Sequence, residues 1–254
     1  MSLLAEDNHN EEEKLDKDSL SRRKFLRNSG FAVGGLAVGG VLGSVIPWGN
    51  EEKEQQQAAN ETKNFNQALM NFNQVEFQVV EAATERIFPE DDLGPGAKSL
   101  GVAFYIDHQL AGSYGFNARD YMNPPFFHGE KTQGYQGRLK RREIFRIGIR
   151  EMQNYSHEKF EKGFTDLTAE EQDTVLTDFA EDNVNLTTIS ASGFFNLIRS
   201  MTLEGVYSDP LYGGNRNMEG WKMRDYPGDQ MNYTKVIESE EFQQIEPRSL
   251  RDHM

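Results

Sequence analysis

Two capping boxes, each followed by apolar residues at helical spacing, restrict the fold of this 254-residue chain more than any other feature. Asn73 precedes Glu76, and Thr168 precedes Glu171. In each pair the two side chains can satisfy backbone N–H groups at the start of a helix. Runs that alternate apolar and polar residues, as strands do, are scarce. The body of the chain is therefore predicted to be mostly α.

Helical periodicity and helix-breaking residues give approximate positions for the predicted helices. They span about residues 74–88, 97–110, 136–159, from 169 through at least 179, and 194–205. Val75 is expected on the buried face of the first helix, at helical spacing from Val79. Residues 111–134 are rich in Gly, Pro, Asn and aromatic residues and are predicted to be irregular. The prediction is a single compact helical domain with long irregular loops.

A twin-arginine pattern precedes this body. It consists of Ser21, Arg22, Arg23, Phe25 and Leu26, and an uncharged, glycine-rich stretch follows from Ser29 to Ile46. Paired arginines before a moderately apolar segment are typical of the signal that the twin-arginine translocase reads on folded proteins. We therefore expect export to the periplasm or to the outer face of the cytoplasmic membrane.

The same glycine-rich segment has an alternative interpretation as a membrane-anchoring helix, since Gly35 and Gly39 have the spacing of a helix-dimerisation motif. No A-x-A cleavage site follows it, so removal of the signal and its retention as an anchor are both open. The expected organisation is a signal or anchor at 1–48, a polar linker at 49–64, the helical domain at 65–238 and a polar tail at 239–254.

Composition excludes several classes of function. The chain has 41 acidic against 27 basic residues, a net charge of −14, so its surface repels phosphate backbones and no nucleic acid partner is expected. It has no cysteine, which excludes iron–sulfur clusters, thiolate zinc sites and covalent c-type haem attachment within this chain. Neither a G-x-G-x-x-G nor a P-loop motif is present. No cofactor is therefore expected in this chain.

Two groups of titratable residues have types that could carry chemistry. Asp91, Asp92, Asp107 and His108 could form an acid–base site or bind a hard cation. Carboxylates near Gly and Pro are more often caps and turn residues, and this interpretation is favoured. His157 and Glu161 are four residues apart, which permits metal ligation on a helix face, but an exposed pair is favoured. No catalytic residue and no metal site is predicted.

An arginine-rich flank lies along the long predicted helix and comprises Arg138, Arg141, Arg142, Arg146 and Arg150. Such a flank can recognise an acidic partner surface or anionic lipid headgroups. The alternative, slightly favoured, is a solvated helix face whose arginines pair with Glu143 and Glu151.

The most distinctive stretch of the sequence runs from Phe194 to Gly228. It contains a Phe-Phe pair, T-x-x-G, S-D-P-L-Y-G-G-N at 208–215, then G-W and Y-P-G. This pattern resembles the signature of the gluconate 2-dehydrogenase subunit 3 (gamma chain) family, and R-I-F-P-E-D at 86–91 resembles an earlier block of that family. We refer to residues 194–228 as the signature segment.

The resemblance implies a function without chemistry of its own. Small subunits of this family pair with a large FAD-dependent dehydrogenase of the glucose–methanol–choline type, and often with a cytochrome c subunit. The chain is thus expected to be a non-catalytic, membrane-associated accessory subunit that supports export and assembly of the flavoprotein, with FAD in the partner. Two alternatives remain open: a subunit that contributes catalytic residues to sugar-acid oxidation, and an independent exported binding module.

The signature segment also supplies the candidate partner-binding residues. They are Asp209, Pro210, Tyr212, Gly213, Gly214, Asn215 and Trp221. Asp and Pro initiate a turn, and Gly and Asn accept left-handed backbone, so the segment can hold aromatic side chains in one fixed presentation. The alternative is that Phe195, Tyr212 and Trp221 are ordinary core.

Overall fold

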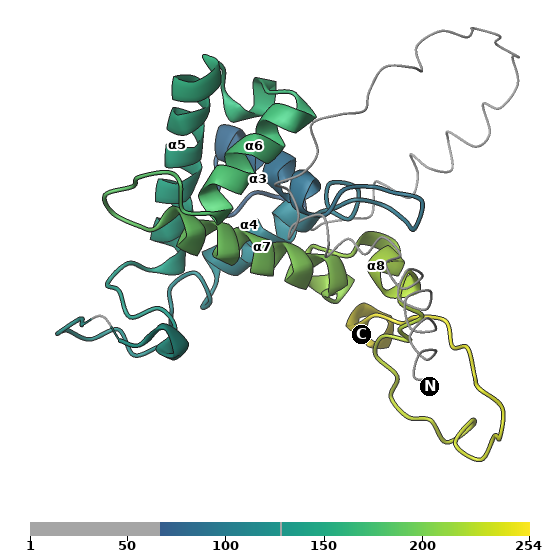
Figure 1. Ribbon diagram of the computed structural model, residues 1–254. Helices are drawn as coiled ribbons and strands as arrows, with labels where there is room; N and C mark the ends of the chain where they lie inside the picture. Colours follow the sequence, from purple (N-terminus) through teal and green to yellow (C-terminus); the bar gives the residue numbers. More distant parts are fainter. Residues whose placement is uncertain (1–66, 128) are drawn as a thin grey trace, which may run out of the picture. The chain divides into compact units, whose positions relative to one another are not determined.

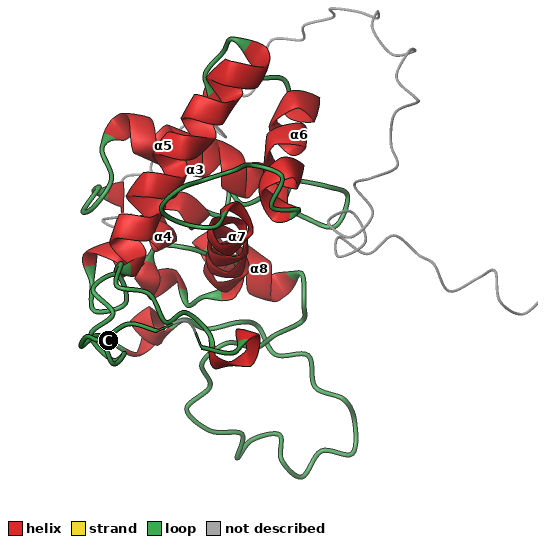
Figure 2. Ribbon diagram, turned by 60° about the vertical axis from the view of Figure 1, so that its left-hand side comes forward, coloured by secondary structure: helices red, strands yellow, loops and turns green. Residues whose placement is uncertain are grey.

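The computed structural model describes residues 67–127 and 129–254, which fall within one compact unit. The predicted signal and linker at 1–64 lie outside the described residues. The prediction of a compact, mostly helical body is confirmed: the described part contains six α-helices and isolated bridges in place of strands (Figures 1 and 2). The helices are α3 (Gln74–Ile87), α4 (Val102–Ala111), α5 (Arg141–Phe160), α6 (Ala169–Ala180), α7 (Ala191–Tyr207) and α8 (Glu219–Lys222).

Both predicted capping boxes are confirmed at the starts of α3 and α6. The Asn73 side chain accepts from the Glu76 N–H at 2.9 Å, and the Glu76 carboxylate accepts from the Asn73 N–H at 2.9 Å. Thr168 and Glu171 repeat this exchange at 3.3 and 2.8 Å. Each box satisfies N–H groups that would otherwise lack a partner at a helix start.

Two predicted helix starts are wrong by several residues. The second helix begins at Val102 and not near Ala97, because Gly101 adopts a left-handed conformation with φ +74°. The long helix begins at Arg141 and not near residue 136. Its first N–H groups bind the preceding loop, since the Arg141 N–H donates to Asn117 Oδ1 at 2.8 Å. The last predicted helix continues two residues beyond Gly205, to Tyr207.

The expected orientation of α3 is correct except at its first turn. Val75 is 61% exposed, whereas Val79 is fully buried. Phe77 takes the inward position in place of Val75, and its ring lies 4.6 Å from that of Phe104 on α4. The helix is also joined to α6 by a bidentate ion pair in which both Arg86–Asp173 bonds measure 2.7 Å.

Helix α7 is the centre of the fold and packs against α3, α4, α5 and α6 (Figure 1). Its Phe194 is buried between Phe145 and Phe179, with ring centroids 5.7 and 6.2 Å away. A side chain at Gly148 of α5 would collide with the Phe194 ring, so glycine is required for this close approach. Burying each such side chain contributes about 1.5–3 kcal/mol.

Among residues 67–127 and 129–254, no helix combines the length and the apolar character that crossing a membrane requires.

Candidate functional site

The signature segment leaves α7 through two short 3-10 helices, η4 (Pro210–Tyr212) and η5 (Arg216–Met218), and reaches α8. Gly213 and Asn215 adopt the left-handed conformations expected of them, with φ +101° and +46°. Gly214 does not, but a side chain there would collide with the Gly205 carbonyl. The turn therefore folds back tightly on the end of α7, as the sequence predicted.

Asn215 holds this turn together from the inside. The residue is fully buried, and its amide donates to the Ser208 carbonyl at 2.8 Å. Its side-chain oxygen accepts from the Gly220 N–H at 2.7 Å, at the start of α8. A buried polar side chain with both ends paired fixes local geometry, because either bond alone would leave an unsatisfied group.

Burial decides whether Phe195, Tyr212 and Trp221 belong to the core or to a partner-binding surface. Phe195 is buried, and Trp221 is only 5% exposed with its Nε1–H donating to the Tyr207 carbonyl at 2.8 Å. Gly228 packs on the Trp221 ring, where an added Cβ would lie 2.5 Å from a ring carbon. Phe195 and Trp221 therefore belong to the core, whereas Tyr212 is 47% exposed and remains available to a partner.

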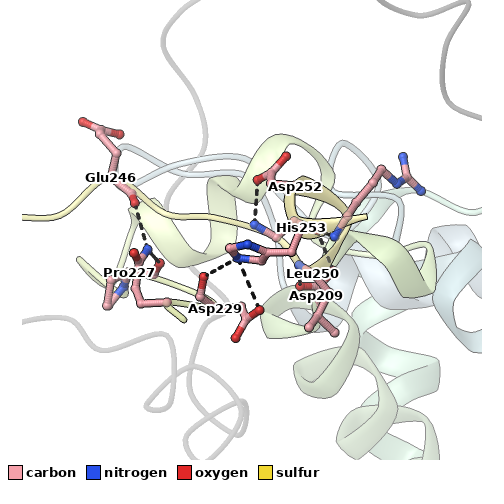
Figure 3. A network of polar contacts seen from close by, with 10 residues as sticks. Asp209, Pro227, Asp229, Glu246, Leu250, Asp252 and His253 are labelled. Atoms are coloured by element: carbon pink, nitrogen blue, oxygen red, sulfur yellow. Dashed lines mark hydrogen bonds and ion pairs between the residues drawn. The ribbon is translucent and has the colours of Figure 1, made fainter. Parts of the chain in front are cut away.

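Asp209 has a second role that the sequence did not indicate. It caps η4 by accepting from the Leu211 N–H at 2.8 Å. It also accepts from the Ser249 hydroxyl and from the Leu250 N–H, both at 2.8 Å (Figure 3). The residue types around Asp209 indicate only a turn, so nothing in the local pattern points to a partner 40 residues away. The end of the chain thus docks on the signature segment.

Further bonds attach residues 248–253 to Pro227, Gly228 and Asp229. Together with the bonds of Asp209, they form what we call the C-terminal clamp. Gly228 and Arg248 form an isolated parallel bridge. The Asp229 N–H donates to the Arg248 carbonyl at 2.8 Å, and the Arg248 N–H donates to the Pro227 carbonyl at 3.1 Å. His253 Nε2 lies 3.1 Å from the Asp229 carbonyl (Figure 3).

The clamp closes a long loop at residues 229–247, which we call the C-terminal arm. Figure 1 shows it as the yellow loop that follows α8. Its exposed large apolar side chains are Met231, Tyr233, Ile237 and Phe242, of which Phe242 is 91% exposed. The arm carries five acidic residues and one lysine. An acidic loop with exposed apolar side chains and fixed ends is suited to bind another protein.

Three of the four acid–base candidates, Asp91, Asp107 and His108, have structural partners. Asp107 is fully buried, and its carboxylate accepts from the backbone N–H groups of Met70, Asn71 and Phe72 at 2.6, 3.0 and 2.7 Å. His108 Nε2 lies 3.0 Å from the Ala68 carbonyl. These contacts tie the segment before α3 to α4.

The other candidates are also placed by the structure. The Asp91 side chain accepts from the Leu93 N–H at 2.8 Å, inside the turn at residues 91–94. Glu161 is the left-handed C-cap of α5, and its N–H donates to the His157 carbonyl. Within the described part of the chain, no group of three His, Cys, Asp or Glu side chains is arranged to hold a metal ion.

The half-buried side chain of Tyr105 lies where α4 meets the signature segment. Tyr105 donates to the Glu204 carboxylate at 3.3 Å. Burial raises the pKa of Tyr105, and the negative charge of Glu204 raises it further, because both disfavour the phenolate. Tyr105 therefore remains a hydrogen-bond donor at neutral pH.

The arginine-rich flank is only partly neutralised. Arg141 pairs with Asp120 at 2.7 Å, and Arg150 pairs with Glu151 at 3.0 Å. Glu143 instead accepts from the Lys140 N–H, at 2.8 Å. The structure therefore confirms the predicted pairing with Glu151, whereas the Glu143 contact is a helix cap.

Comparison with known proteins gives one family. The family model described as Gluconate 2-dehydrogenase subunit 3 matches residues 74–228. No curated protein and no solved structure matches the chain. The matched region contains the helical body and the whole signature segment, and it ends where the C-terminal arm begins.

Proposed function

Because the chain belongs to the gluconate 2-dehydrogenase subunit 3 family, we propose that it is the non-catalytic small subunit of an FAD-dependent gluconate 2-dehydrogenase-type complex. The observation that carries this proposal is the family match, which extends over the helical body and the signature segment. The family name designates a subunit of a larger enzyme. The partners proposed here are the FAD-carrying dehydrogenase of the glucose–methanol–choline type and, as a further chain of the complex, a cytochrome c subunit.

The proposed contact surface combines the exposed part of the signature segment with the C-terminal arm. Tyr212 and Tyr226 are exposed on the segment, and Phe242 is exposed on the arm. Asp209 joins the two parts through its bonds to Ser249 and Leu250 (Figure 3). The backbone N–H groups of Tyr212 and Tyr226 are bonded within the signature segment, so these two side chains lose little conformational freedom on docking.

Two observations support a role without chemistry in this chain. The absence of cysteine requires that any iron–sulfur or covalently attached haem group reside in other chains. Asp107, the buried carboxylate among the acid–base candidates, already accepts three backbone N–H groups. The catalytic alternative is tested with the purified chain alone, which should bind no flavin and should not reduce a dye with gluconate. A stoichiometric flavin spectrum would contradict the proposal.

We further propose that this chain supplies the export signal for the flavoprotein. Flavin is inserted in the cytoplasm, so a loaded enzyme has to cross the membrane folded, and Arg22 and Arg23 provide the corresponding address. Replacing both by lysine should leave the chain and the flavoprotein together in the cytoplasm. Arg27→Lys is the matched control and should leave export unchanged.

Cell fractionation distinguishes the two parts of the proposal. Export of the flavoprotein in the Arg22→Lys, Arg23→Lys variant would contradict the escort role and would leave the pairing standing. Purification of a tagged chain from its native host tests the pairing itself: it should recover a flavoprotein in a fixed ratio. Recovery of the chain by itself, with export unaffected, would favour the independent binding module.

A further inference from the structure

The loop between α4 and α5 is the second part of the described chain with many exposed aromatic side chains. We call residues 112–140 the aromatic loop; it includes the short helix η2 (Lys131–Gln133) and extends away from the helices in Figure 1. Its exposed rings are Phe116, Tyr121, Phe126, Phe127 and Tyr135. Tyr121 is 84% exposed and Phe127 is 76% exposed. Single exposed apolar residues are common on soluble proteins, but five rings on one loop indicate a binding surface.

The charge of this region is opposite to that of the chain as a whole. Residues 112–142 contain six Lys or Arg and two Asp or Glu, in a chain with a net charge of −14. One of the two acids, Asp120, is paired with Arg141. Arg119, Arg138 and Lys140 are exposed, so the region presents a positive charge to its surroundings.

Contacts with α5 hold cations and rings side by side at the base of the loop. The Arg142 guanidinium lies 4.4 Å from the centroid of the Phe116 ring, and the Lys140 ammonium lies 5.5 Å from it. The Arg142 N–H donates to the Gly115 carbonyl at 3.2 Å. The Arg141 N–H donates to Asn117 Oδ1 at 2.8 Å. The base of the loop is thus fixed to α5, while Tyr121 and Phe127 farther along the loop are exposed.

We propose that the aromatic loop docks on an anionic lipid bilayer, with its exposed rings in the headgroup region and its basic residues against the lipid phosphates. Aromatic rings concentrate at the headgroup level of membranes, and Lys and Arg are attracted to anionic leaflets. Charge complementarity selects this loop, because the acidic remainder of the surface is repelled by the same leaflet. The proposal does not depend on the identity of the protein partner.

The absence of cysteine makes a site-specific test possible in the full chain. A Phe127→Cys variant labelled with an environment-sensitive dye reports on the loop alone, wherever else the chain touches the membrane. With vesicles of equal parts phosphatidylcholine and phosphatidylglycerol, the dye emission should shift to the blue and increase. With pure phosphatidylcholine vesicles, the change should be at least about fivefold smaller at equal lipid.

A label at Phe242→Cys is the matched control, since this position on the acidic arm is even more exposed to solvent than Phe127. Its emission should not change with either vesicle. In the Phe127→Cys background, Arg119→Gln with Arg138→Gln should weaken the apparent affinity for the anionic vesicles by about tenfold or more. Arg150→Gln with Arg251→Gln removes the same charge outside the loop and should have a smaller effect. Circular dichroism checks that each variant keeps its helices.

Three results would overturn the proposal. The loop label could remain in water on anionic vesicles, it could respond equally to the two lipid compositions, or it could respond only to the flavoprotein. The last result would identify the aromatic loop as a protein contact.

Discussion

The aromatic loop and the C-terminal arm both expose large apolar side chains, but they differ in charge and in attachment. The loop at 112–140 has mainly basic charges and is fixed to the start of α5. The arm at 229–247 has five acidic residues and one lysine, and it is fixed to Asp209 through the C-terminal clamp. Judged by exposed apolar side chains alone, both segments would be assigned to the same type of binding surface. Their charges separate them, because an anionic membrane would attract the basic loop and repel the acidic arm.

The family match adds a second difference. It includes the aromatic loop and ends at Gly228, one residue before the arm. The arm therefore lies outside the matched region, and it is attached to that region at Asp209 of the signature segment.

The largest expected effect is a loss of stability at Trp221, the buried residue that supports the start of the arm. Trp221→Ala should lower the free energy of unfolding by about 3–5 kcal/mol, because the ring is buried and Gly228, immediately before the arm, packs on it. Chemical denaturation of the isolated chain measures this loss. Tyr212→Ala, on the exposed side of the same turn, is the control and should change stability by no more than about 0.5 kcal/mol.

The next effect concerns binding by the arm. Phe242→Ala should weaken the complex with the flavoprotein by about 2 kcal/mol, roughly 30-fold in Kd, while the melting temperature stays the same. Phe127→Ala makes the same change on the aromatic loop and should leave this Kd unaltered. Titration calorimetry of both variants tests the contrast, which fails if the loop variant loses more affinity than the arm variant.

A smaller loss is expected from opening the C-terminal clamp. Asp209→Ala removes the acceptor for Leu211, Ser249 and Leu250 and should cost about 1–2 kcal/mol of stability. Trypsin should then cleave faster after Arg248, whose backbone N–H and carbonyl are both bonded in the intact clamp. Cleavage after Arg119 in the loop is the internal control and should keep its rate. Equal acceleration at both sites would show that Asp209 stabilises the whole fold and not the clamp.

The smallest expected effect is at the base of the loop. Arg142→Gln removes the cation that lies 4.4 Å from the Phe116 ring, an interaction of about 0.5–1 kcal/mol at an exposed site. Thermal unfolding should show a small loss, and cleavage after Arg248 in the clamp should be unchanged. A loss as large as that of Trp221→Ala would mean that the loop is part of the core.

Local signals in the sequence predicted much of this fold. The capping boxes at Asn73 and Thr168 act between residues three positions apart, so the sequence alone shows them. Periodicity placed the helices, but their starts were less certain. Gly101 and Asn117 determine where α4 and α5 begin, and Asn117 acts from 24 residues away.

The candidate site was predicted in part for the same reason. The left-handed conformations of Gly213 and Asn215 follow from residue type, and the structure confirms them. The burial of Trp221 and the bonds of Asp209 to residues 249 and 250 depend on long-range packing, to which spacing gives no guide. The predicted boundary at residue 238 divides the arm between the domain and the polar tail. The acidic residues make the average composition of the arm polar, so composition gives no sign that Ile237 and Phe242 are exposed apolar side chains.

Hydrogen–deuterium exchange on the chain with and without its flavoprotein tests most directly whether the two surfaces have different partners. Peptides from residues 229–247 should exchange more slowly in the complex, and peptides from residues 112–140 should exchange at the same rate as in the free chain. Protection of the aromatic loop with an unchanged arm would contradict the account.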